Sequence, residues 1–272
     1  MDIFNLVMTR LFDAILRPFR DIHPIWGISV VAAIAGAAAV WVFGNITNQE
    51  KIRERKAKIK GHLLEMWIFR ERSASVFRAQ YRILWSMLKY TLSCLPALAI
   101  LLMPMGLVII QMQVRYGYES PRPNEAVIIR ITFAEPLSLE SMEAHLEVPD
   151  GIVVETPALR IVERKEIDFR ISAKCAGVYN LAVRTKNDHV TKALCVGKCG
   201  VAISRIRSRD LLDRLLCPAE YGMQDKALHS IEVLYPRKTI HILLWDLHWT
   251  WLFLVVLILV GISTRRGLKV EL

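Results

Sequence analysis

Three stretches of this sequence contain no Asp, Glu, Lys or Arg: residues 22–49, 90–114 and 247–264. Each holds about 17–25 mostly apolar residues, enough for a helix rising 1.5 Å per residue to cross a hydrocarbon core of roughly 30 Å. The composition, with 53% hydrophobic and 23% charged residues, is close to that of soluble proteins. It is the grouping of the apolar residues into these stretches that indicates a membrane protein. The sequence therefore predicts a membrane protein with several spans, and it excludes a free soluble enzyme, a disordered chain and a secreted mini-protein.

The first apolar stretch does not read as a cleaved signal peptide. The residues before it carry acidic as well as basic side chains, and Gly44-Asn45-Ile46 is a poor cleavage site. We therefore expect three retained transmembrane helices, at 24–44, 90–114 and 241–264.

Charge is distributed unevenly between the polar segments. Residues 45–89 hold eleven basic and four acidic side chains, whereas residues 115–240 hold nineteen basic and seventeen acidic ones. Short loops rich in Lys and Arg stay in the cytoplasm. We therefore expect residues 45–89 and the tail 265–272 to be cytoplasmic, the N-terminal segment and residues 115–240 to lie outside, and the chain to reside in a bacterial inner membrane.

Two helical elements are predicted outside the spans. Residues 1–23 alternate apolar and charged positions at helical spacing, which predicts an amphipathic helix lying on the outer membrane surface. Residues 45–89 contain no Pro and show an apolar stripe in each half. We expect an antiparallel helical hairpin whose second arm continues into the second span.

The hairpin is the first candidate site, because its cations greatly outnumber its carboxylates. They are expected to contact a hydrophobic client protein or the ribosome, or anionic lipid headgroups. A role in fixing the topology alone is the alternative. The candidate residues are Lys51, Arg53, Arg55, Lys56, Lys58, Lys60, Arg70 and Arg72.

A second candidate site is a polar recess at the cytoplasmic ends of the spans. Its residues are uncharged and polar, and the alternative is that they are ordinary span ends: Asn45, Thr47, Gln49, Ser86, Thr91 and Ser93. The nearby run Ala32–Ala39 is made largely of small residues, which let another helix approach closely.

The outer segment, residues 115–240, predicts an antiparallel β-sandwich. Six short runs rich in β-branched and aromatic residues follow one another between turn signals, at 126–133, 144–148, 158–162, 167–171, 179–183 and 190–196. Residues 176–183 resemble the strand of immunoglobulin-like domains that follows a tyrosine corner, with Tyr179 as the tyrosine. A short helix over 208–216 and a last strand near 231–235 are expected after these strands.

Four of the five cysteines lie in this outer segment, where an oxidising compartment favours disulfides. We expect Cys175 to pair with Cys195 and Cys199 with Cys217. A zinc site built from the four thiolates and free thiols are the two alternatives.

The sequence offers no catalytic motif. It contains no nucleophile elbow, Walker loop, Gly-rich dinucleotide turn or His-Glu-x-x-His, and its seven histidines are scattered. No charged residue lies near the middle of a predicted span, which argues against ion-coupled transport. We therefore expect no enzyme activity, no cofactor, no metal site and no DNA binding.

The order of these parts resembles the YidC/Oxa superfamily of membrane insertases, over about residues 5–110. Leu11–Val30 is similar to the segment leading into that family's first core span, and Cys94-Leu95-Pro96 with Pro104 is similar to the start of its second. Like the eukaryotic and archaeal relatives, the chain has three predicted spans. It has no Arg between Arg20 and Arg53, where bacterial members carry one that lines a wet groove.

Two functions follow for this α+β membrane protein. The resemblance implies a biogenesis factor whose basic hairpin receives a hydrophobic client and whose small-residue spans ease its passage into the lipid. The alternative is a non-catalytic scaffold subunit of an envelope complex, anchored by its spans and binding an outer protein partner through its β-sandwich.

Overall fold

The computed structural model describes residues 2–19, 22–68, 73–134, 144–185, 189–197, 202–218, 220, 223, 227–242, 245–268 and 270. The chain divides into two compact units, which are described separately. The first combines Met1–Gly27 with Ile109–Trp249, and the second combines Ile28–Val108 with Thr250–Leu272.

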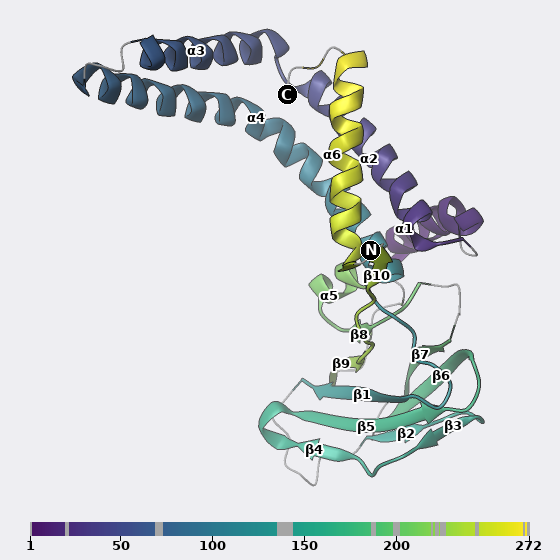
Figure 1. Ribbon diagram of the computed structural model, residues 1–272. Coiled ribbons are helices and arrows are strands. Elements are labelled where there is room, and N and C mark those ends of the chain that lie inside the picture. Colours follow the sequence, from purple (N-terminus) through teal and green to yellow (C-terminus); the bar gives the residue numbers. More distant parts are fainter. Residues whose placement is uncertain are drawn as a thin grey trace. The chain divides into compact units, whose positions relative to one another are not determined.

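Three helices are long and apolar enough to cross a membrane, as predicted. They belong to α2 (Pro24–Ile46), α4 (Ser73–Tyr116) and α6 (Trp249–Gly267) (Figure 1). The expected second arm of the hairpin and the second span form the single helix α4, which contains Pro96 and Pro104. An unbroken helix satisfies the backbone hydrogen bonds that lipid cannot.

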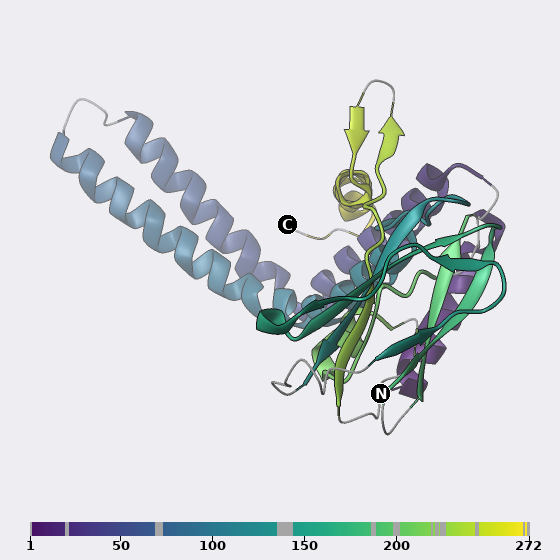
Figure 2. The same cartoon turned by 90° about the horizontal axis from the view of Figure 1, so that it is seen from below.

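In the second unit, α3 (Gln49–Ile68) runs side by side with the first half of α4 in both views (Figures 1 and 2). The two helices and the end of α2 share a small apolar core. Ile52 of α3 is 1% exposed, and it packs with Phe43 of α2 and with Cys94 and Ala97 of α4. This core fixes the base of the hairpin.

Helices α2 and α6 approach closely through glycines. A Cβ added at Gly36 would lie 2.8 Å from the carbonyl oxygen of Leu257, and one added at Gly261 would lie 3.6 Å from the side chain of Val40. Ala32 on α2 is fully buried. The small-residue run of α2 thus permits close packing of another helix, as predicted.

In the first unit, α1 (Asp2–Leu16) is followed by a short 3-10 turn, η1 (Arg17–Phe19). Phe12 and Leu16 of α1 are buried, whereas Val7, Leu11 and Ile15 are exposed. The helix therefore packs one apolar face on the protein and leaves a second one open.

The same unit holds two antiparallel sheets. The larger has the order β3-β5-β1-β9-β8, with β4 also paired to β5, and the smaller has the order β2-β6-β7. The bounds are β1 (Ala126–Phe133), β2 (His145–Glu147), β3 (Ile152–Val154), β4 (Leu159–Ile161), β5 (Glu166–Ala173), β6 (Gly177–Arg184), β7 (His189–Val196), β8 (Ile206–Ser208) and β9 (Leu228–Val233). A 3-10 turn, η2 (Val162–Arg164), joins β4 to β5.

Alternating side chains of both sheets meet in one hydrophobic core. Ile131 of β1, Ile167 of β5 and Ile231 of β9 have no exposed surface, and neither has Leu181 of β6. The period of two that predicted the strands is the period of this burial. Tyr179 also donates a 2.9 Å hydrogen bond to the carbonyl oxygen of Cys175, four residues upstream, which is the contact of a tyrosine corner.

Several elements differ from the expectations. The strands β3 and β8 were not predicted, and the expected helix at 208–216 is the shorter α5 (Leu211–Leu216). The third span begins at Trp249 and not at residue 241, because β10 (Ile240–Ile242) and β11 (Trp245–Leu247) pair as a hairpin before it. Across the β10–β11 pair, the exposed side chains of His241 and Asp246 contact each other, and such polar groups disfavour insertion into lipid.

The glycine contact between α2 and α6 generates a test. Gly36→Ala adds only a methyl group, which must displace the backbone of Leu257, so the full chain should lose about 1–3 kcal/mol of unfolding free energy. Gly106→Ala in α4 is the matched control, because a Cβ there meets nothing within 4 Å. Unfolding in mixed micelles measures both, and equal stabilities of the two variants would contradict the packing.

Candidate functional site

The basic hairpin carries two kinds of cation. Lys51, Arg53, Lys58 and Lys60 of α3 are exposed. Arg55 and Lys56 are half-buried, and Arg70 and Arg72 fall outside the described residues. The exposed four are therefore available to a partner outside the chain.

Arg55 instead ties the two helices of the hairpin together. Its guanidinium donates hydrogen bonds to the backbone carbonyl of Lys89 and to the hydroxyl of Ser93, both in α4. These acceptors lie within two turns of Pro96, which removes one helical hydrogen bond from α4. Arg55 thus stabilises the base of the hairpin and is not an exposed contact residue.

The residues predicted to form a polar recess are only partly brought together. Thr47 is buried, donates to the carbonyl of Phe43 at 2.6 Å and accepts from Gln49 at 2.5 Å. Ser93 accepts from Arg55. Asn45 and Thr91 are exposed, and Ser86 is half-buried. The structure therefore groups Thr47 with Gln49, and Ser93 with Arg55.

The hairpin also exposes large apolar side chains. In α3, Leu64 is 60% exposed and Trp67 is 74% exposed, while in α4 Tyr81 and Leu84 are both more than 60% exposed. Trp85 is 49% exposed, and the ammonium of Lys89 lies 5.2 Å from its ring centroid. Soluble helices normally bury such side chains, so this apolar surface beside cations is a candidate binding surface.

The three spans differ in how much protein covers them. In α2, 39% of the most apolar 18-residue window is buried inside the chain, whereas in α4 and in α6 only 11% is. Most of the surface of α4 and α6 is therefore open to lipid or to another transmembrane helix.

A charged cluster that sequence reasoning missed lies in the first unit, between α1 and the end of α4. Arg115 is 9% exposed, and its guanidinium donates to the carboxylate of Asp13 at 2.8 Å, to the carbonyl of Thr9 at 2.9 Å and to the side chain of Gln111 at 2.6 Å. It also lies 5.8 Å from the ring centroid of Phe12. The signal in the sequence was that Arg115 is the first charge after the second apolar stretch.

The cluster fixes α1 against the end of the second span, which yields a prediction. Asp13→Asn removes the charge that neutralises Arg115, so contact between the helices should weaken by about 1.5–3 kcal/mol. Faster hydrogen exchange of the α1 amides in the full chain measures the loss. Arg10→Gln, an exposed position on the same helix, should leave exchange unchanged. Equal rates in both variants would show that the ion pair does not hold α1.

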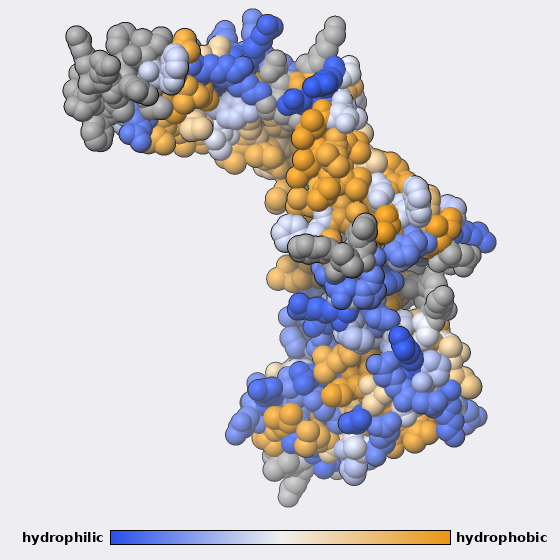
Figure 3. Space-filling model, in the orientation of Figure 1, coloured by the Kyte–Doolittle hydropathy of each residue, from blue (hydrophilic) through white to orange (hydrophobic). Residues whose placement is uncertain are grey.

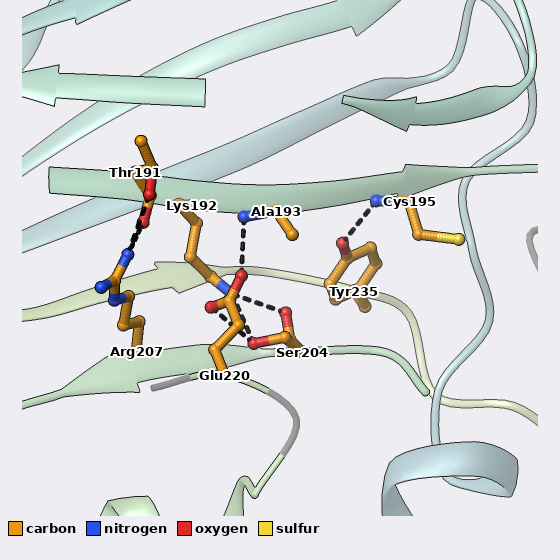
Figure 4. Close-up of polar contacts among 8 residues, drawn as sticks. All are labelled: Thr191, Lys192, Ala193, Cys195, Ser204, Arg207, Glu220 and Tyr235. Carbon is orange, nitrogen blue, oxygen red and sulfur yellow. Dashed lines mark hydrogen bonds and ion pairs between the residues drawn. The ribbon is translucent and has the colours of Figure 1, made fainter. Parts of the chain in front are cut away.

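A second missed cluster surrounds Lys192 in the β domain (Figure 4). Lys192 occupies an inward position of β7 and has no exposed surface. Its ammonium donates to the carbonyl and hydroxyl oxygens of Ser204, at 2.8 and 2.7 Å, and to the carboxylate of Glu220 at 2.7 Å. Glu220 also accepts from the hydroxyl of Ser204 and from the amide of Ala193.

This geometry is structural and not that of a serine nucleophile activated by a lysine. Burial lowers the pKa of Lys192, and the carboxylate of Glu220 opposes that shift. All three ammonium protons have acceptors, so Lys192 is held as a cation and provides no base for Ser204. Nearby, burial raises the pKa of Tyr235 to about 12, and its hydroxyl accepts from the amide of Cys195. The sequence did contain a sign of this burial, because Lys192 shares a strand face with the apolar residues Val190 and Leu194.

The outer cysteines do not pair as predicted. Cys175 and Cys217 carry free thiols, so neither Cys175–Cys195 nor Cys199–Cys217 is formed, while Cys195 is disulfide-bonded. The register partner of Cys195 is Val178, three residues from Cys175. Cys175 itself precedes the first residue of β6 and lies outside this register. Cys199 lies outside the described residues.

Among the described residues, Asp210, Asp213 and His229 form the group whose ligand atoms are close enough to hold a metal ion, all within 4.8 Å of one another. Asp210 is exposed and lies 3.7 Å from the imidazole of His229. This is a contact between side chains at the protein surface. The group contains no cysteine, so it is not the thiolate zinc site considered from the sequence.

No protein-family model matches the chain, and no curated protein or solved structure is significantly similar to it.

The buried cluster of the β domain provides a prediction about stability. Lys192→Met leaves Glu220 without its cation and should destabilise the domain by about 3–5 kcal/mol. Hydrogen exchange of the β7 amides in the full chain should accelerate by about two orders of magnitude or more. Lys174→Met is the control because Lys174 is exposed in the same domain. Unchanged protection in Lys192→Met would contradict the structural role.

Proposed function

We propose that this protein is a membrane protein biogenesis factor of the YidC/Oxa type, which passes hydrophobic client segments into the bilayer without covalent chemistry. The observation that carries the proposal is the hairpin, which joins exposed apolar side chains to exposed cations between the first two spans. The apolar side chains offer contact to a hydrophobic client, and the cations offer contact to ribosomal RNA or lipid phosphates.

The topology in this proposal follows from the order of the segments. The hairpin lies between the first and second spans and the β domain lies between the second and third, so the two occupy opposite sides of the membrane. The hairpin carries the excess of Lys and Arg and is assigned to the cytoplasm. The β domain is then outside, where we propose an immunoglobulin-like sandwich on the basis of its shared core and its tyrosine contact.

The open faces of α4 and α6 support the same function, because a client helix leaving the hairpin needs a protein surface beside lipid. The hydrogen-bonded pair of buried Thr47 and half-buried Gln49 lies where α2 meets α3. The proposed function does not use the groove arginine of bacterial insertases, because the chain has no Arg between Arg20 and Arg53, where those proteins carry it.

A second candidate function is favoured by the β domain. Apolar side chains stay exposed on β3 and β4, which pair with the same edge of β5: Val153, Val154 and Leu159. Exposed apolar sheet edges are sites of association. In this alternative the chain is a scaffold subunit that binds a protein partner outside the membrane.

Crosslinking separates the two functions. The four exposed cations are replaced together, as Lys51→Gln, Arg53→Gln, Lys58→Gln and Lys60→Gln. The readout is photocrosslinking of ribosome-bound chains carrying a transmembrane segment to the full-length protein in membrane vesicles. Binding through four phosphate contacts should weaken by at least tenfold at physiological salt.

The matched control removes four exposed cations from the β domain, as Arg122→Gln, Arg160→Gln, Arg164→Gln and Lys174→Gln. The insertase proposal expects this variant to crosslink like the wild type. If crosslinks instead survive in the hairpin variant and map to the β domain, the insertase proposal fails and the scaffold alternative stands.

A further inference from the structure

Helix α5 exposes its apolar face, whereas a helix of a water-soluble domain normally buries that face. Its sequence Leu-Leu-Asp-Arg-Leu-Leu places leucines at 211, 212, 215 and 216, which share one face. Leu211 is 62% exposed, Leu212 is 73% exposed and Leu216 is 53% exposed, whereas Asp213 and Arg214 on the other face are half-buried. The apolar face therefore points away from the protein, which is the reverse of a solvated helix.

The position of α5 in the sheet brings it to the end of the second span. It follows β8, which is the edge strand of the order β3-β5-β1-β9-β8. The chain just before β8 is bound to the end of α4, because the amide of Ile203 donates to the carbonyl of Val114 at 3.1 Å. Arg205 also donates to the hydroxyl of Tyr118 at 2.9 Å. The β8 edge is thus the edge of the sheet nearest to the membrane-spanning helix.

The C-terminal end of α5 also lies beside the start of β8. Cys217, directly after the helix, lies beside Arg205 and the backbone of Ile206. Since six residues of helix extend only about 9 Å, the whole of α5 stays near the β8 edge. Figure 3 shows apolar surface where Figure 1 places α5.

The level of the membrane within this unit is set by the ends of the spans, Tyr116 of α4 and Trp249 of α6. Trp249 is 1% exposed and its indole donates to Gln113 at 3.0 Å, so both ends are fixed in the same unit. The headgroup layer extends the 30 Å hydrocarbon core by about 5–8 Å on each side. A helix attached to residues 203–205, which contact Val114 and Tyr118, therefore lies at the depth of this layer.

We propose that α5 is an interfacial anchor, whose exposed leucines enter the outer leaflet of the bilayer and hold the β8 edge against the membrane. Lipid is the occupant that the structure favours, because the chain that leads into α5 is bonded to residues at the end of the second span. The anchor does not depend on the insertase function, since it serves a scaffold subunit equally well.

The test uses a spin label on the full chain in nanodiscs of phosphatidylethanolamine and phosphatidylglycerol. Leu212→Cys is made together with Cys175→Ser and Cys217→Ser, because both native thiols are free and neither is fully buried. The label's accessibility is measured to oxygen, which concentrates in lipid, and to a water-soluble nickel chelate. Leu159→Cys in the same background is the matched control. Leu159 is a similarly exposed leucine, and β4 pairs with β5, on the opposite side of the sheet from β8.

The anchor predicts a ratio of oxygen to nickel accessibility at Leu212 several-fold above the ratio at Leu159. A nickel accessibility equal to that of Leu159 would show that α5 is in water and would overturn the proposal. Protection from both reagents would overturn it too, because a protein partner or a second copy would then cover the leucines. Leu212 is mostly exposed, so replacing it with a labelled cysteine does not disturb the hydrophobic core.

Discussion

A polypeptide in hydrocarbon must satisfy its own backbone hydrogen bonds, and the rest of this structure depends on that constraint. It turns each long uncharged stretch into an uninterrupted helix. In the topology that we propose, three such spans put the helical hairpin and the β domain on alternate sides of the membrane. Even the two prolines of α4 lie inside a continuous helix.

The same cost of burying polar groups explains the charged clusters. Arg115 at the end of α4 is almost buried, and five hydrogen bonds to Asp13, Thr9 and Gln111 compensate it. Lys192 in the β domain is fully buried, with each ammonium proton bound. By contrast, four cations of α3 are exposed beside exposed apolar side chains: Lys51, Arg53, Lys58 and Lys60. The chain thus pairs its buried charges where they hold the fold together and exposes others where we propose a partner.

The sequence predicted the parts that follow from periodicity. The three spans, the continuous α4 and the strand at 126–133 appear where alternation and charge-free length place them. It missed β3 and β8, which have only three residues each and too few positions to show alternation. It also missed the partners of Arg115 and Lys192, because contacts between residues about 100 or 28 positions apart leave no local pattern. The disulfide pairing failed because it depends on the strand register, which the sequence alone does not provide.

The central claim is that the basic hairpin and the β domain lie on opposite sides of the membrane, and thiol labelling tests it most directly. An impermeant maleimide is added to intact spheroplasts expressing either Cys217→Ser, which keeps the exposed Cys175, or Lys58→Cys combined with Cys175→Ser and Cys217→Ser. The account predicts labelling of Cys175 in intact spheroplasts, and labelling at position 58 only after the membrane is permeabilised. Labelling of both positions in intact spheroplasts would contradict it.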